Sequence, residues 1–388
     1  EAQNKLVGTV IEYIKGMPVV KAFNLAGKSH KATSEDFWKL TEAQIKFEKR
    51  FSTPIIVSQC MTGLCISAVI FICGYVGLDG GMELPFVIAM SVFAFELAAP
   101  MLALINITAF RVADASLDRY DRVRQTEMMD DSGKPVRLNN FDIDFKNVTF
   151  GYNESAVIKN MSFHIPQHSM TALVGKSGCG KSTLIQLIPR FYDVTEGSIK
   201  IDGVDVRNYD LETLRNKIGF IPQKTILFSG TIADNMRFGK HDANEKELVE
   251  AAKVAQAYDF IMDKPDQFDE MVYEGGTNMS GGQKQRMSIA RAVIRNPEIY
   301  IFDDSFSALD FKTDATLRAQ LKEITTDSIV VIVAQRISSI MDANKIIVLD
   351  NGEIVGYGSH ADLIQTCPVY LEIAESQLTK EELAKWTK

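Results

Sequence analysis

Nine consecutive residues, 175 to 183, have the composition of a loop that binds phosphate groups. They read Gly-Lys-Ser-Gly-Cys-Gly-Lys-Ser-Thr and follow the apolar run 170–174, which is typical of a buried strand. Glycines let backbone N–H groups turn inward around a polyphosphate, and the helix expected next presents its positive N-terminus. The sequence therefore predicts a nucleotide-binding loop made of Gly175, Lys176, Ser177, Gly178, Cys179, Gly180, Lys181, Ser182 and Thr183.

Four side chains supply the chemistry that a bound nucleoside triphosphate requires. Lys181 provides a cation for the phosphates, and the Ser182 hydroxyl can ligate Mg²⁺. Further along, the apolar run 299–302 ends in Asp303 and Asp304, whose carboxylates are suited to orient Mg²⁺ and water. Alone, this acidic pair is equally typical of a capped strand end. Together with the loop, it favours a site for ATP and Mg²⁺.

The elements around the loop indicate an α/β domain. Apolar residues alternate at Phe141, Ile143 and Phe145, which predicts a strand, and later apolar strands alternate with helical patterns. The polar stretch before them, residues 126–140, predicts a linker. We expect the α/β domain to span residues 141–375 and a C-terminal helix or tail to span residues 376–388.

The first third of the chain has the composition of a membrane region. Residues 55–78 carry no formal charge, and at about 1.5 Å per residue such a helix crosses roughly 30 Å of hydrocarbon. A short polar turn follows, and residues 84–110 form a second apolar run interrupted only by Glu96. We expect residues 1–125 to contain a helical hairpin with spans at about 55–78 and 84–110. The alternative is a buried helical hairpin of a soluble protein.

Charges around the hairpin indicate its orientation. Basic residues flank both ends, which by the positive-inside tendency places both ends in the cytoplasm and the turn outside: Lys46, Lys49, Arg50, Arg111, Arg119 and Arg122. A carboxylate in mid-span is costly if exposed to lipid, so we expect Glu96 to face the translocation path or a partner helix. The alternatives are a position nearer the interface or a protonated, hydrogen-bonded carboxyl.

Net charge and cysteine content narrow the possible functions. The net charge of −8 argues against a protein that coats nucleic acid. The five cysteines show no metal-ligand spacing, which favours free thiols in a reducing cytosol. Because the chain begins at Glu1 within a helical pattern, we expect it to be a fragment of a longer protein.

Residues 278–283, Asn-Met-Ser-Gly-Gly-Gln, are similar to the signature of ATP-binding cassette (ABC) proteins. Residues 141–365 resemble the nucleotide-binding domain of that family, and residues 1–125 resemble the end of an exporter-type membrane domain. The resemblance implies ATP-driven export of a small molecule, such as a drug, lipid or peptide-like compound. It further implies a bacterial cell-membrane protein with a cytoplasmic cassette, in which ATP binding and hydrolysis power inward and outward switching.

The resemblance also implies roles for individual residues. Tyr152 matches the aromatic residue that stacks on adenine, and Gln223 matches a residue that contacts Mg²⁺ and senses the nucleotide. Asp310 lies in the family motif that follows the paired acids, and Glu274 matches an exporter element that touches the membrane domain. Two cassettes of this family meet head to tail, so the signature would bind ATP held by a partner subunit: Ser280, Gly281, Gly282 and Gln283.

Two residues depart from the family pattern at the catalytic site. Asp304 stands where efficient members have Glu, so its carboxylate is set back by one methylene, and errors of about 1 Å can cost about a hundredfold in rate. Gln335 stands where the family usually has His, and it cannot carry a proton. The pair resembles the slow site of a heterodimeric exporter. The alternative is a homodimer that works at reduced speed.

Three other functions share part of this pattern. A soluble cassette ATPase acting on nucleic acid or ribosomes would have the same loop and signature, although the apolar hairpin argues against it. An exporter-shaped importer of metal-siderophore complexes would have the same architecture. A regulator whose ATP binding gates a channel or receptor is the third, and nothing in the sequence requires it.

Overall fold

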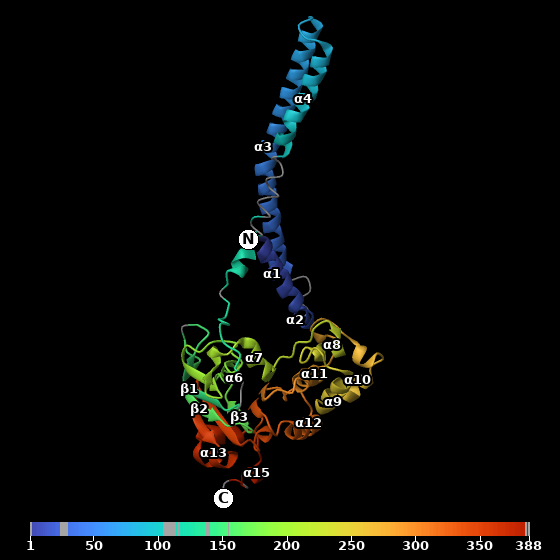
Figure 1. The fold of residues 1–388 in the computed structure, drawn as a ribbon. Helices are drawn as coiled ribbons and strands as arrows, with labels where there is room; N and C mark the ends of the chain where they lie inside the picture. Colours follow the sequence, from blue (N-terminus) through green and yellow to red (C-terminus); the bar gives the residue numbers. More distant parts are fainter. Residues whose placement is uncertain are drawn as a thin grey trace. The chain divides into compact units, whose positions relative to one another are not determined.

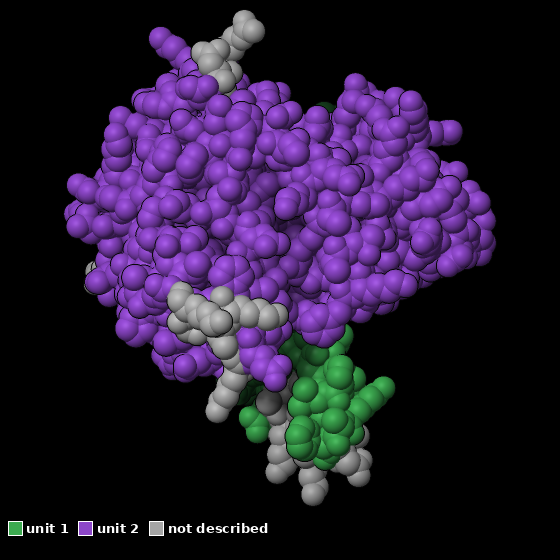
Figure 2. All heavy atoms as spheres, turned by 90° about the horizontal axis from the view of Figure 1, so that it is seen from below, with its two compact units in different colours: residues 1–128 green, residues 129–388 purple. Residues whose placement is uncertain are grey.

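The structure is a computed structural model that describes residues 2–23, 30–103, 114, 117–118, 120–126, 128–136, 140–153, 155–384 and 386. The chain divides into two compact units, Glu1–Met128 and Met129–Lys388, which Figure 2 shows in green and purple. The boundary falls inside the linker predicted at residues 126–140. The part of that linker from Met129 onward belongs to the second unit.

The first unit is built of helices in the described residues (Figure 1). They are α1 (Ala2–Lys15), α2 (Met17–Ala22), α3 (His30–Leu78) and α4 (Leu84–Ala103). The helices α3 and α4 pack against each other and are joined by a turn in which Gly80 has a left-handed φ of 81°. The Thr9 hydroxyl of α1 donates to Asp36 Oδ2 of α3 at 3.0 Å, which ties α1 to α3.

Large apolar side chains are exposed along α3 and α4. Phe71 and Leu78, for example, are 74% and 92% exposed. By length and composition, one helix of the described chain, Ser34–Leu78, could cross a membrane, and Leu84–Glu96 is a shorter apolar helix. The predicted hairpin is therefore helical from residue 55 to Leu78 and from Leu84 to Ala103. Residues 104–110, Arg111 and Arg119 lie outside the described residues.

The second unit contains two main sheets. The antiparallel sheet has the order β2 (Ile158–Ile165), β1 (Ile143–Phe150), β4 (Glu196–Ile201) and β5 (Val204–Asp205). The larger sheet has the order β12 (Glu353–Gly358), β11 (Lys345–Asp350), β3 (Met170–Gly175), β10 (Ile329–Val333), β9 (Ile299–Asp303) and β6 (Ile218–Ile221). Its strands are parallel except β12. A short pair, β7 (Gly230–Thr231) and β8 (Met271–Val272), completes the strands of the described chain.

Helices cover the larger sheet on the face opposite the antiparallel sheet, and shorter ones lie between the two sheets (Figure 1). The α-helices of this unit are α6 (Lys181–Gln186), α7 (Leu211–Asn216), α8 (Ile232–Arg237), α9 (Glu245–Val254), α10 (Tyr258–Met262), α11 (Gly281–Val293), α12 (Phe311–Ile324), α13 (His360–Thr366), α14 (Pro368–Glu375) and α15 (Lys380–Ala384). Single 3₁₀ turns are η2 (Val206–Asn208), η3 (Gln267–Asp269), η4 (Glu274–Gly276) and η5 (Ile337–Ser339).

Two hydrophobic cores lie on opposite faces of the larger sheet. Successive residues of a strand point to opposite faces, so Ile299 and Ile301 of β9 join one core, and Tyr300 and Phe302 join the other. Every residue of β9 and β10 is buried, which explains why both strands are continuous apolar runs in the sequence. The predicted α/β fold is confirmed, and the carboxyl ends of β3, β10, β9 and β6 lie along one edge of the sheet.

A buried histidine links the two helices that follow the larger sheet. His360 of α13 is 2% exposed, and its Nδ1 lies 2.7 Å from the Tyr370 hydroxyl of α14. Its Nε2 has no hydrogen-bond partner among the described residues, and Trp386 approaches the ring edge-on. Burial lowers the pKa of His360, because a charged imidazolium would be poorly solvated there.

We expect the second unit to lose stability as the pH falls below about 6.5, the ordinary histidine pKa. In that window the unfolded chain protonates His360 while the folded chain keeps it neutral, so acidification favours unfolding until the lower folded pKa is reached. Melting temperatures of the purified protein between about pH 7.5 and about pH 5.5 measure this. His360→Gln should flatten the dependence, whereas His168→Gln, at an exposed position, should not. An equal slope in both variants would contradict the assignment.

Candidate functional site

Most of the predicted site residues line one cavity at the carboxyl edge of the larger sheet. Its volume is about 540 Å³, within the range of small-molecule sites in proteins. The lining comprises Val157, Val174, Gly175, Lys176, Ser177, Gly178, Gly180, Lys181, Ser182, Thr183, Gln223, Asp303, Asp304, Val333, Ala334, Gln335, Ile373 and Gln377. The four neighbouring parallel strands β3, β10, β9 and β6 each lead into part of this lining. This is the edge where ligands bind in open α/β sheets.

Glycine is required at two points of the phosphate loop. A Cβ at Gly175 would lie 2.2 Å from the Leu349 carbonyl oxygen, so the loop leaves β3 in contact with the end of β11. Gly180 has a left-handed φ of 102° and precedes the first residue of α6, and a Cβ there would lie 2.8 Å from Ile158 Cδ1. Both glycines let the backbone turn into the N-terminus of α6, where free N–H groups can face an anion.

Lys181 and Ser182, the first residues of α6, point into the loop and toward β9. Lys181 Nζ donates to the carbonyl oxygens of Gly175 and Lys176 at 2.8 and 2.9 Å. The Ser182 hydroxyl donates to Asp303 Oδ1 at 2.7 Å. Cys179 is buried, with its Sγ 3.6 Å from Lys181 Nζ. The ammonium group is therefore held at the centre of the loop.

Asp304 receives amide hydrogen bonds from two loops that follow other strands. Gln223 Nε2 and Gln335 Nε2 donate to its Oδ2 at 3.0 and 2.6 Å. Asp304 has a left-handed φ of 47°, a strained conformation that aspartate tolerates better than most residues. The Ser307 hydroxyl donates to the Asp304 carbonyl oxygen at 3.0 Å, closing the turn.

Burial dominates the electrostatics of the two adjacent carboxyls. Asp303 and Asp304 are 5% and 7% exposed, and desolvation raises the pKa of each above its ordinary value. Hydrogen bonds oppose this rise: from Ser182 at Asp303, and from Gln223 and Gln335 at Asp304. A nearby cation would further favour the charged forms, so the pair is suited to bind a metal ion with phosphate.

Tyr152 lies beside α6 and is not among the residues that line the cavity. Its hydroxyl is 3.2 Å from Thr183 Oγ1 and donates to Gln186 Oε1 at 3.3 Å. The ring packs edge-on against Phe150 and Tyr192 and stays half exposed. An exposed aromatic face next to the phosphate loop could stack on a base, and that role stays a prediction.

The signature residues lie outside the cavity, at the start of α11. Ser280 caps this helix: its hydroxyl accepts from Gln283 N at 3.2 Å, and Gln283 Oε1 accepts from Ser280 N at 3.0 Å. A Cβ at Gly281 would meet nothing within 4 Å, so this helix N-terminus is open on one side. The Thr225 hydroxyl donates to Gln285 Oε1 at 2.8 Å, which joins α11 to the loop that carries Gln223.

Three other predicted residues lie apart from the cavity lining. Asp310 caps α12, where its carboxylate accepts from Thr313 N at 3.0 Å, and these bonds lower its pKa. Glu274 is exposed at the start of η4. Glu96 is exposed on α4 in the first unit, so its role on a translocation path stays a prediction.

Comparison with known proteins agrees with this geometry. Residues 158–307, which contain the phosphate loop, the signature and the paired acids, match the model of the ABC transporter family. The chain contains a domain of the ABC transporter type. The chain is also similar to the solved structure of a bacterial Atm1-family ABC exporter with ATP bound, with 28% identity and a TM-score of 0.90. The match covers 98% of this chain and 68% of the exporter chain.

Curated relatives extend the match into the helical unit. An uncharacterized ABC transporter ATP-binding protein of Mycobacterium bovis is 37% identical over 384 residues, 94% of this chain. A Bacillus subtilis protein named for multidrug export is 35% identical and also covers 94%. The ATP-dependent lipid A-core flippase of Syntrophus aciditrophicus is 33% identical over 96%. The chain spans 63–64% of the length of these three relatives.

The ABC domain also uses C-terminal residues that the sequence patterns did not indicate. Gln377, just after α14, donates from Nε2 to the Gln335 carbonyl oxygen and accepts at Oε1 from Ile337 N, both at 2.8 Å. Lys176 of the phosphate loop forms an ion pair with Glu372 of α14 at 3.2 Å. Ile373 and Gln377 both line the cavity. These contacts join segments about 40 and 200 residues apart, so no local motif could reveal them.

We expect Gln377→Ala to weaken Mg-ATP binding at this loop. The substitution removes two hydrogen bonds that hold the backbone beside Gln335, each worth about 0.5–1.5 kcal/mol. If all of this energy contributed to ATP binding, the affinity would fall by about 5- to 150-fold. Equilibrium binding of Mg-ATP to the protein in lipid measures the change. Glu372→Ala is the control, because its ion pair is exposed and worth less than about 1 kcal/mol. Equal affinities in both variants would argue against a positioning role for Gln377.

Proposed function

We propose that the chain is part of one half of an ATP-driven exporter, with ATP and Mg²⁺ held at its own phosphate loop. The observation that carries this proposal is the convergence of Lys181, Ser182, Asp303, Asp304 and Gln223 on one cavity at the end of four parallel strands. Side chains at this position can bind a triphosphate and orient a water beside it. Because the chain is shorter than its relatives, the transported molecule and the transport cycle belong to the complete assembly.

The donor set fits Mg²⁺. The ion takes oxygen ligands and is usually held by one or two carboxylates together with substrate phosphates. Ser182 Oγ and Asp303 Oδ1, which lie 2.7 Å apart, would hold it, and Gln223 would approach it. Among the described residues no group of three or more His, Cys, Asp or Glu side chains could hold a metal. When bound, the ion would offset the phosphate charge, and these residues would keep its position fixed.

We further propose that this chain pairs with a second half-transporter, and that its own loop forms the slower of two composite ATP sites. The signature residues do not line the chain's own cavity, and the helix N-terminus is open at Gly281, as binding to a partner's nucleotide would require. The general-base position holds Asp304, and two amide donors already occupy one of its oxygens. A carboxylate set back by one methylene and hydrogen-bonded in this way is poorly placed to polarise water.

The helical unit supports a location in the cell membrane with the ABC domain in the cytoplasm. The exposed apolar surfaces of α3 and α4 suit lipid or further membrane helices, and the turn at residues 79–83 would face outside. A small molecule is the expected substrate, since relatives are named for multidrug export and lipid A-core transport.

Two substitutions should affect different ATP sites of the complete transporter. Lys181→Ala should weaken ATP binding at this loop by about 10- to 150-fold, the loss of a charge-assisted contact, while turnover at the partner's loop persists. Ser280→Arg should abolish most turnover, because it blocks the helix N-terminus that completes the partner's site. Photolabelling with an ATP analogue and steady-state ATPase assays separate the two. The reverse pattern would contradict the assignment of sites.

Restoring the family residues should accelerate the slow site. The double variant Asp304→Glu with Gln335→His is expected to raise turnover at this loop by up to about a hundredfold, since the carboxylate then reaches the water. Single-turnover hydrolysis, with the partner's loop lysine replaced, measures this site alone. Asp304→Asn serves as the control and should stay slow. Brisk, cooperative hydrolysis by the unmodified protein without a partner would instead indicate a homodimer.

A further inference from the structure

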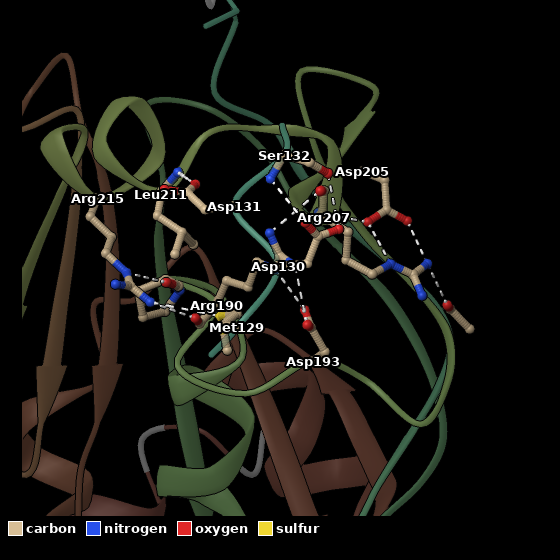
Figure 3. Close-up of polar contacts among 12 residues, drawn as sticks. Met129, Asp130, Asp131, Ser132, Arg190, Asp193, Asp205, Arg207, Leu211 and Arg215 are labelled. Carbon is tan, nitrogen blue, oxygen red and sulfur yellow. Dashed lines mark hydrogen bonds and ion pairs between the residues drawn. The ribbon is translucent and has the colours of Figure 1, made fainter. Parts of the chain in front are cut away.

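The segment Met129–Lys134, here called the docked linker, is attached to the ABC domain at several points (Figure 3). Asp131 Oδ1 accepts from Leu211 N, the first residue of α7, at 2.7 Å. Lys134 N donates to the Asn208 carbonyl oxygen at 3.1 Å, and the Lys134 carbonyl oxygen accepts from Asp210 N at 3.4 Å. These bonds form a short parallel bridge beside Tyr209. A flexible tether would not make paired backbone hydrogen bonds of this kind.

Close packing supports the same conclusion. A Cβ at Gly133 would lie 2.2 Å from both the carbonyl carbon and the oxygen of Tyr209. Tyr209 cannot move aside easily, because its ring is fully buried and its hydroxyl donates to the Ile201 carbonyl oxygen at 2.6 Å. Only glycine fits between the docked linker and this loop.

Opposite charges lie near each other at the other end of the docked linker. Asp130 and Asp131 lie near the buried guanidinium of Arg190, and both raise its pKa, although Asp193 is the larger cause. The pKa of Asp130 is lowered by hydrogen bonds from the Ser132 hydroxyl and backbone, and further by Arg190. The contacts lie within the second unit, as the sticks of Figure 3 show.

Arg215 of α7 joins the docked linker to the end of the phosphate-loop helix. Its Nε donates to the Pro189 carbonyl oxygen at 3.2 Å, and its Nη2 donates to the Arg190 carbonyl oxygen at 2.8 Å. The same Nη2 lies 4.0 Å from Met129 Sδ. Residues 187–190 directly follow α6. This six-residue helix is about 9 Å long and begins with Lys181 and Ser182.

The other end of α7 leads to the opposite side of the site. After Asn216 the chain enters β6, which pairs with β9 beside Asp303 and ends just before Gln223. The helix α7 thus contacts the docked linker at its N-terminus and connects to both α6 and the Gln223 loop. A displacement of the docked linker that moved α7 would reach Lys181 and Gln223 together, because packed elements move as units.

We propose that the docked linker and α7 form a transmission route between the membrane helices and the nucleotide site, with Asp131, Gly133 and Arg215 as positioning residues. This inference rests on the proposed function, because transmission needs a transporter that switches with ATP. The first unit ends at Met128, directly before the docked linker, so a movement of that unit would pull on α7. The nucleotide would in turn bias the position of the first unit, because coupling between two sites is reciprocal.

The experiment first tests whether the linker is docked and then whether it transmits. Hydrogen exchange of the Leu211 amide in the complete transporter in lipid reports the bond to Asp131. Gly133→Ala and Asp131→Ala should speed this exchange about fivefold or more. Asp131→Asn keeps an acceptor oxygen and Lys134→Ala keeps both backbone bonds, so both should exchange like the unsubstituted protein. Unchanged exchange in Gly133→Ala and Asp131→Ala would overturn docking.

Transmission is measured with a fluorophore at Asp79→Cys, in the turn between α3 and α4, on a background without Cys60 and Cys65. Mg-ATP is the added ligand. Gly133→Ala should reduce either the amplitude or the rate of the fluorescence response about tenfold. Its Kd for Mg-ATP should stay within about twofold of the Kd of the unsubstituted transporter. Asp131→Ala should act in the same direction, and Asp131→Asn should restore the response.

The outcomes separate the two proposals. A full response in Gly133→Ala and Asp131→Ala, with faster Leu211 exchange, would overturn transmission through the docked linker and leave the proposed function intact. A tenfold weaker Kd in these variants would show a merely structural role and would also overturn it. No response to Mg-ATP in the unsubstituted transporter would overturn the proposed function itself, and transmission with it.

Discussion

The nucleotide site depends on burying two adjacent carboxyls, Asp303 and Asp304, at the end of a strand that is buried throughout. Desolvating a carboxylate is costly unless hydrogen bonds or a cation compensate. The fold supplies the hydrogen bonds from three other strand ends: Ser182 after β3, Gln223 after β6 and Gln335 after β10. The strand order of the larger sheet therefore determines the chemistry of the site, because it places these three hydrogen-bond donors around the two adjacent acids.

Contiguous motifs were predictable from the sequence because their chemistry requires fixed local spacing. The phosphate loop needs glycine where the backbone turns at Gly175 and Gly180, and the acids must follow a buried strand, so each motif identifies its own element. The α/β class was also predictable from local sequence. Apolar residues repeat about every two positions in a half-buried strand and about every 3.6 positions in a helix, so alternating strands and helices can be told apart. The helical hairpin could be located from charge-free runs. The helix α3 extends well beyond the predicted span, because charged residues limit a membrane span without ending a helix, and α3 continues through Pro54.

Contacts between distant segments could not be predicted in this way. The amide of Gln377 holds the backbone on both sides of Arg336, and Asp131 holds the start of α7, yet each is an ordinary polar residue in its local sequence. Residues 129–134 have the composition of a flexible linker, and their hydrogen bonds arise only because the loop ending at Tyr209 lies beside them. The composition of a segment indicates its own conformational preference. Whether the segment docks depends on the residues that the fold places beside it.

The two departures from the family pattern form a single structural unit. Asp304 and Gln335 share a hydrogen bond of 2.6 Å, so the shorter carboxylate and the neutral amide satisfy each other. A histidine at 335 could donate to the same oxygen only in one tautomer or charge state, whereas the amide of Gln335 can always donate. Replacing one partner alone therefore changes the environment of the other, and residues in such contact rarely contribute additively. Under the proposed function, this pairing would make the site hold ATP rather than assist proton transfer, and the partner's site would carry out most of the hydrolysis.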